Sequence, residues 1–111
     1  MKMKTTTKTG TDQKITVALD PALQAIVPGF LENRRGDLQK LHTARNQQDL
    51  TTVELLGHRM KGDGGGYGFD AISEIGAALE QAALQEDWTA IARQTTALGD
   101  FLTRVDVVYR K

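Results

Sequence analysis

One stretch of this 111-residue chain combines a histidine, basic side chains and an unusual number of glycines: GHRMKGDGGGYGFD, residues 57–70. If it is a helix, with a step of about 100° per residue, its core-facing side consists of Val53, Leu56, Gly57, Met60 and Gly64. His58 then falls nearly opposite, with Lys61 beside it in the next turn and with Gly62 and Gly65 on the same outer face. We therefore predict that His58 is exposed and is not a packing residue.

The two outer glycines suggest what an exposed histidine could do here. Glycine costs a helix about 1 kcal/mol per residue relative to alanine, and no core packing requires it at Gly62 or Gly65. Without side chains at these positions, a partner's surface can approach the imidazole closely. A neutral imidazole is a nucleophile at physiological pH, and the Lys61 ammonium can bind phosphoryl oxygens. The pattern favours a phosphoryl-accepting histidine over an incidental surface one.

Three further residues of the same helix are candidates for contact with a partner. Leu55 lies on the His58 side and is expected to be an exposed part of a docking patch, together with Arg59. Glu54, four residues before His58, either hydrogen-bonds the imidazole or is a solvated charge. We assign Leu55, Glu54 and Arg59 to partner binding.

Other kinds of site fit the sequence poorly. No glycine is followed by Lys-Ser or Lys-Thr, as a P-loop requires, and the GxGxxG pattern fails at Tyr67. His42 has no histidine or carboxylate at HExxH spacing, so we predict no metal site and no cofactor. The simpler role of Gly66 and Gly68 is to end the helix.

The elements that must position His58 follow from capping signals and periodicity. We expect residues 1–14 to be a flexible polar tail and residues 15–111 to form a single domain. Residues 15–19 alternate and fit a short extended lead-in, but one such run without a partner cannot make a sheet. Everything after it is expected to be helical, beginning with a short helix over residues 21–27. The starts of four longer helices are indicated by Pro28, Asp49, Asp70 and Asp87, and the stripe of the last runs from Ile91 to Tyr109.

Short connections between these helices predict antiparallel neighbours. The expected fold is all-α: an antiparallel up-down-up-down four-helix bundle with a short extra N-terminal helix.

Composition and charge argue against two further classes of function, nucleic-acid binding and membrane spanning. The chain has 14 basic and 14 acidic side chains, so it is a poor candidate for nucleic-acid binding. It has no cysteine, and no apolar run approaches the roughly 20 residues that span a bilayer. We expect a soluble, cytoplasmic monomer that contacts neither nucleic acid nor membrane.

Residues 58–69 resemble the signature of the histidine-containing phosphotransfer (HPt) domain family. That pattern is a histidine, a lysine three residues later, a glycine four later, small residues near seven, and a glycine ten later before a hydrophobic residue. The matching positions here are His58, Lys61, Gly62, Gly65, Gly68 and Phe69. The Leu79-Glu80 pair also resembles the next helix of the family, and the similarity covers roughly residues 28–110.

The resemblance implies a function for each matched residue. His58 would be phosphorylated, Lys61 would stabilise the phosphoryl group, and Gly62 would leave room for the partner. Such proteins exchange phosphoryl groups with the aspartate of receiver domains, in response regulators or hybrid histidine kinases, and the magnesium belongs to the receiver. The chain would then be a carrier without a kinase or nucleotide-binding domain. Two departures are Asp63, a charge beside the small residues, and three consecutive glycines at 64–66.

The same residues also fit a second hypothesis. The chain would be a non-catalytic adaptor bundle that binds partner proteins through Leu55 and the glycine-smoothed face, with His58 incidental.

Overall fold

The computed structural model describes residues 13–110 of the chain. In chain order its elements are β1 (Ile15–Leu19), the 3₁₀ turn η1 (Pro21–Leu23), α2 (Val27–Gln47), α3 (Leu50–Tyr67), α4 (Asp70–Leu84), α5 (Trp88–Arg104) and β2 (Val105–Tyr109). The tail predicted for residues 1–14 lies outside the described residues up to position 12.

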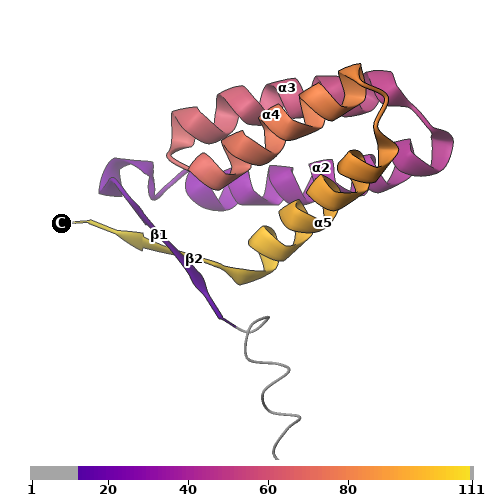
Figure 1. Ribbon diagram of the computed structural model, residues 1–111. Coiled ribbons are helices and arrows are strands. Elements are labelled where there is room, and N and C mark those ends of the chain that lie inside the picture. Colours follow the sequence, from indigo (N-terminus) through magenta and orange to yellow (C-terminus); the bar gives the residue numbers. More distant parts are fainter. Residues whose placement is uncertain (1–12, 111) are drawn as a thin grey trace, which may run out of the picture.

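The four helices form the predicted antiparallel bundle (Figure 1). Helices α3 and α4 lie side by side as one layer, and α2 and α5 form the layer beneath them. The two strands leave the bundle on the side of α2 and α5. Among the helices of residues 13–110, none is long and apolar enough to cross a membrane.

Capping residues fix where α3 and α5 begin, as the sequence predicts. The Thr52 N–H donates to Asp49 at 3.1 Å, and the Ala90 N–H donates to Asp87 at 3.0 Å. The prediction for α4 was wrong by one residue: Phe69 is its N-cap, and Asp70 is the first helical residue. There its carboxylate still lies at the positive end of the helix dipole.

The ends of the chain differ from the prediction in two places. The expected helix over residues 21–27 is only the 3₁₀ turn Pro21–Leu23, because α2 begins at Val27 with Pro28 in its first turn. The last helix ends at Arg104 rather than continuing to Tyr109.

Residues 105–109 form β2, which supplies the partner that β1 was predicted to lack. The two strands pair in parallel, with Ile15 opposite Val105 and Leu19 opposite Tyr109. The β-branched and aromatic residues of VDVVY favour an extended chain. Their alternate side chains, Val105, Val107 and Tyr109, pack against the core together with Ile15 and Val17. The sheet therefore holds both ends of the described chain to one side of the bundle.

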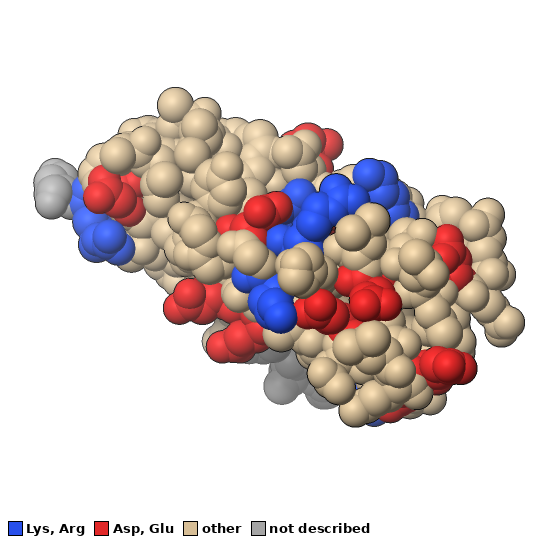
Figure 2. All heavy atoms as spheres, turned by 90° about the horizontal axis from the view of Figure 1, so that it is seen from above, with Lys and Arg blue, Asp and Glu red and all other residues tan. Residues whose placement is uncertain are grey.

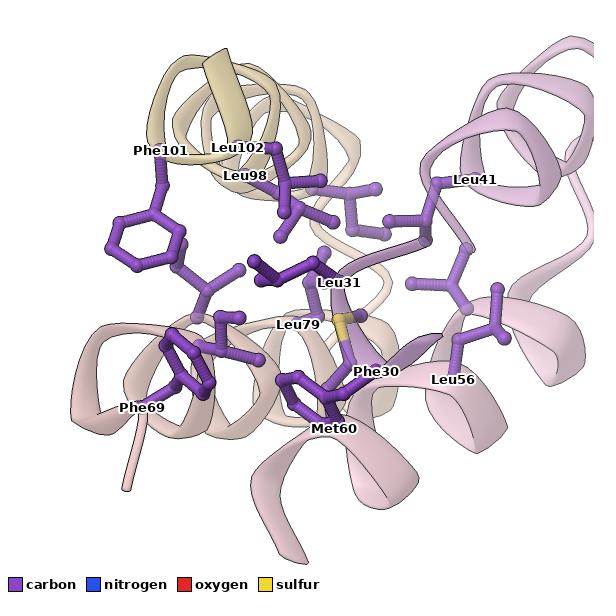
Figure 3. Close-up of a cluster of buried hydrophobic side chains, with 14 of the residues drawn as sticks. Phe30, Leu31, Leu41, Leu56, Met60, Phe69, Leu79, Leu98, Phe101 and Leu102 are labelled. Carbon is purple, nitrogen blue, oxygen red and sulfur yellow. The ribbon is translucent and has the colours of Figure 1, made fainter. Parts of the chain in front are cut away.

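The core lies between the four helices. Its side chains point toward one another from all four, as the residues labelled in Figure 3 show. Met60 of α3 and Leu79 of α4 are fully buried, as are Leu41 of α2 and Leu98 of α5. The whole predicted stripe of α4 is buried: Ile72, Ile75, Leu79, Ala82 and Ala83.

One charged cluster lies at the edge of this core. Arg34 of α2 is a buried residue whose Nε lies 2.9 Å from Asp37, and its guanidinium lies 4.9 Å from the centre of the Phe30 ring. Burial raises the pKa of the Asp37 carboxyl, and the nearby Arg34 charge opposes this shift. A second Arg34 nitrogen lies 3.4 Å from Asp63 of α3. Arg34 thus connects α2 to Asp63, the acidic residue of the glycine-rich segment of α3.

Candidate functional site

His58 lies near the middle of α3, on its outer side. Its side chain is 66% exposed, whereas the buried residues of α3 are the five predicted from periodicity: Val53, Leu56, Gly57, Met60 and Gly64. The helical wheel therefore places His58 correctly, because the apolar side of α3 is fixed by the core beneath it.

Two glycines bring α4 unusually close to α3 at the level of His58. A Cβ atom added at Gly57 would lie 2.6 Å from the Glu80 nitrogen and 2.8 Å from the Gly76 oxygen. A Cβ atom at Gly76 would lie 2.7 Å from the Gly57 oxygen, and it would also collide with the Lys61 nitrogen. Because real side chains do not tolerate such distances, glycine is required at both positions. The two backbones are in contact, so side chains of α4 can reach the exposed face of α3.

Glu80 of α4 uses this proximity to bind two residues of α3. Its Oε2 lies 3.0 Å from His58 Nδ1, and its Oε1 lies 2.9 Å from Lys61 Nζ. The hydrogen bond from Lys61 and then that from His58 hold the pKa of the Glu80 carboxyl below its ordinary value, against a smaller opposing effect of desolvation. At neutral pH the carboxylate is therefore ionised and links the two α3 side chains.

This link determines which ring nitrogen carries the proton when the imidazole of His58 is neutral. An ionised carboxylate can only accept hydrogen bonds, so Nδ1 must carry the proton that it shares with Glu80. The other ring nitrogen, Nε2, then has a free lone pair. In this tautomer His58 presents a nucleophilic nitrogen to its surroundings.

The glycines next to His58 differ from one another in their surroundings. A Cβ atom at Gly62 would have no atom within 4 Å, so the surface there is open. At Gly65 the nearest atom would be Ser73 Oγ, at an ordinary contact distance of 3.9 Å. Gly68 has a φ of 85° and ends α3, as predicted for Gly66 or Gly68. The packing thus offers no reason for glycine at Gly62, one turn from His58, and the same holds for Gly66, two turns away.

The surface next to His58 contains an apolar hollow. This hollow has a volume of about 480 Å³ and is lined by Thr51, Glu54, Leu55, His58 and Glu80. Leu55 is half exposed at 51%, as predicted. Glu54 lies at the hollow, but the carboxylate that binds the imidazole is Glu80. The hydrogen bond to the imidazole that was one alternative for Glu54 is therefore made by Glu80.

Charges of both signs lie next to one another on this face. Figure 2, which views the molecule from above the α3–α4 layer, shows basic and acidic side chains together near its middle. Lys61 contributes to this arrangement through its ion pair with Glu80, and Arg59 is exposed on the same helix. Among residues 13–110 there is no group of three or more His, Asp or Glu side chains placed to hold a metal ion.

Comparison with protein families matches residues 26–107 to the Hpt domain. The match covers most of the chain, including all four helices, and the chain therefore belongs to the Hpt domain family. No curated protein and no solved structure gives a significant match. Members of this family are phosphotransfer carriers of two-component signalling that interact with receiver domains, and they are not kinases.

Reasoning from the residues missed the contacts of Glu80 with His58 and Lys61. The sequence comparison picked out Leu79-Glu80 only as a similarity to the family, and Glu54 was the carboxylate considered for the ring. The signal that could have found Glu80 is the pair Gly57 and Gly76, since glycine on the core side of two neighbouring helices indicates close backbone approach. Glu80 lies one turn after Gly76 and therefore beside the same contact.

Proposed function

We propose that this chain is a phosphorelay intermediate that carries a phosphoryl group on Nε2 of His58. It accepts the group from the phosphorylated aspartate of a receiver domain, or from a kinase, and passes it to the aspartate of another receiver. The observation that carries this proposal is the exposed imidazole whose Nδ1 is held 3.0 Å from the Glu80 carboxylate.

The chemical step uses the tautomer that Glu80 favours. The Nε2 lone pair attacks phosphorus, the bond from phosphorus to the donor's carboxylate oxygen breaks, and that oxygen leaves with the bonding electrons. The proton stays on Nδ1, so the ring becomes positively charged as the new bond forms. The Glu80 carboxylate next to Nδ1 stabilises this charge. Transfer to the next aspartate is the reverse of this step.

Lys61 and Gly62 serve the transferred group and the partner. Lys61 Nζ is held next to His58 by Glu80, so its positive charge is available to phosphoryl oxygens. Gly62 leaves open space one turn from the ring, through which a receiver can bring its aspartate within bonding distance. Gly65, Leu55, Glu54 and Arg59 complete the proposed contact surface. Magnesium, where the reaction uses it, is expected on the receiver and not on this chain.

The proposal also covers the domain limits, the location and the oligomeric state of the chain. We place the described residues from Ile15 onward in one domain and expect a cytoplasmic monomer. The Hpt match over residues 26–107 and the pairing of β1 with β2 support these domain limits.

The test is incubation with a receiver domain carrying labelled phosphate on its aspartate. The unmodified chain should gain an acid-labile label, and the His58→Gln variant should gain none. The matched control is His42→Gln, because His42 is also exposed but lies on α2, and this variant should gain label normally. His58→Gln should melt within a few degrees of the original, since an exposed substitution rarely shifts stability by more than about 0.5 kcal/mol.

The adaptor hypothesis makes the opposite prediction in the same experiment. The exposed Leu55 beside the hollow would serve partner binding in either case. An adaptor would bind its partner without taking label, and binding would be unaffected by His58→Gln.

A further inference from the structure

The segment that follows Lys61 is intrinsically weak as a helix. Residues 62–68 contain glycine at 62, 64, 65, 66 and 68, and glycine inside a helix is destabilising relative to alanine. The segment is nevertheless helical up to Tyr67. Contacts with neighbouring helices must therefore hold it, and with it the position of Lys61.

Helix α4 contacts Lys61 at three points along one stripe. Ser73, Gly76 and Glu80 are spaced i, i+3 and i+7, so they lie on the same side of α4. The Ser73 hydroxyl donates to the Lys61 carbonyl oxygen at 2.7 Å. Gly76 packs against the Lys61 backbone nitrogen, and Glu80 binds the Lys61 ammonium at 2.9 Å. One stripe of α4 thus fixes the carbonyl, the amide and the charged end of a single lysine.

The Ser73 contact lies where the weak segment begins. Within α3 the Lys61 carbonyl accepts the helical hydrogen bond from the N–H of Gly65. This bond closes the first turn of the glycine-rich segment. A Cβ atom at Gly65 would lie at an ordinary contact distance of 3.9 Å from Ser73 Oγ, so the Ser73 hydroxyl lies beside this turn without requiring glycine there. Gly64 packs on the Ser73 backbone, where a Cβ atom would lie 2.5 Å from the Ser73 nitrogen. Gly64 therefore allows the close approach of Ser73 and its helix.

The opposite side of the segment is held by α2. Asp63 and Tyr67 are the only residues of 62–68 with side chains. Asp63 lies 3.4 Å from Arg34, and the Tyr67 ring lies 4.5 Å from the Phe30 ring. These contacts fix the segment on its α2 side. The backbone that Ser73 binds on the other side is therefore held in place.

We propose that Ser73 is a positioning residue for Lys61: its hydrogen bond to the Lys61 carbonyl holds the start of the glycine-rich segment against α4 and keeps the lysine ammonium beside Glu80 and His58. The effect on transfer rests on the function proposed above, whereas the holding of Lys61 does not.

The first test measures the holding of Lys61 without any phosphate. In Ser73→Ala, amide hydrogen exchange of residues 62–66 should become about threefold faster, since one net hydrogen bond is lost. The pKa of Glu80, followed by NMR, should rise toward its ordinary value because Lys61 is less firmly held. The control is Thr103→Ala, which removes a hydroxyl bonded 2.9 Å from a carbonyl of its own helix, α5. That variant should change neither measurement, and unchanged values in Ser73→Ala would overturn the proposal.

The second test asks whether Ser73 acts through Lys61 in phosphoryl transfer. Ser73→Ala should slow transfer from a receiver about threefold in the original chain and have no further effect in the Lys61→Ala background. Equal slowing in both backgrounds would mean that Ser73 only supports the fold, and the positioning role would be wrong. If the original chain takes no label at all, the proposed function fails, while exchange and the Glu80 titration still decide whether Ser73 holds Lys61.

Discussion

Replacement of Gly62 by leucine separates partner access from stability. A Cβ atom at this position meets no atom within 4 Å, so leucine enters without collision. Leucine is a better helix former than glycine by up to about 1 kcal/mol. For a domain of this size such a gain raises the melting temperature by about 3 to 4 °C. The variant should therefore be slightly more stable than the original chain.

The same change should abolish transfer. A branched side chain one turn from His58 would occupy the space through which a receiver approaches the imidazole. Phosphorylation by a small donor such as phosphoramidate needs no docking surface and should be much less affected. The matched control is Gly66→Leu, since Gly66 also has open space but lies two turns from His58. It should gain similar stability and retain more transfer than Gly62→Leu.

The assays are thermal unfolding and the initial rate of label transfer from a phosphorylated receiver. Normal transfer by Gly62→Leu would refute the clearance argument, and Gly62 would then have no functional explanation. Equal loss in Gly62→Leu and Gly66→Leu would show that the receiver covers a larger face than the one proposed.

Three further changes test the packing and charge arguments. Lys61→Ala should slow transfer with little loss of stability in thermal unfolding, because the lysine is half exposed and its proposed role is to stabilise the phosphoryl oxygens by its charge; a normal transfer rate would remove that role. Gly76→Ala should lower the free energy of unfolding by about 1 to 2 kcal/mol, since overpacking against backbone outweighs the gain in helix propensity; a higher melting temperature would contradict the close contact of α3 and α4. Arg34→Met should lower the free energy of unfolding by about 3 kcal/mol at pH 7, because it leaves the buried Asp37 without the arginine that it pairs with. The pKa of Asp37 is already raised by burial and should rise further in this variant. The loss of unfolding free energy, measured in urea, should therefore shrink as the pH falls and Asp37 is protonated. A loss of unfolding free energy that does not depend on pH would show that the Arg34–Asp37 pair is not responsible.

The contribution of the Glu80 carboxyl to stability depends on pH in the opposite direction to that of Asp37. Its pKa is lower in the folded chain than its ordinary value of 4.5, so its contribution to folding is present above that pH. The contribution is lost as the pH falls through the lowered pKa. The contacts of Glu80 with His58 and Lys61 should therefore persist at neutral pH and disappear only in acid.

Periodicity and capping were sufficient to predict the four helices and the exposed face of α3. The apolar residues of α3 and α4 recur at one spacing only, so the sides facing the core were determined by the sequence. The position of His58 opposite Met60 follows from that spacing alone.

The C-terminal strand could not be separated from a helix by the same reasoning. Leu102, Val105 and Tyr109 fit a helical stripe, whereas Val105, Val107 and Tyr109 fit strand alternation. The β-branched residues decide in favour of a strand only when β1 is available as a partner. That pairing joins residues 90 positions apart, and local patterns carry no information about it.

The contacts of Glu80 were missed for a related reason. They depend on two helices approaching at Gly57 and Gly76, and hence on the packing distance between α3 and α4. A helical wheel shows which side of one helix is exposed, but it does not show which side chain of the neighbouring helix reaches that side.

His58 is proposed to accept the phosphoryl group through Nε2 because Glu80 binds Nδ1. The most direct measurement is NMR of the ring nitrogens of His58 after phosphorylation by a receiver, with the histidine nitrogens labelled by ¹⁵N. We predict coupling of phosphorus to Nε2 and a proton on Nδ1. Phosphorus on Nδ1, or on a residue other than His58, would contradict the account.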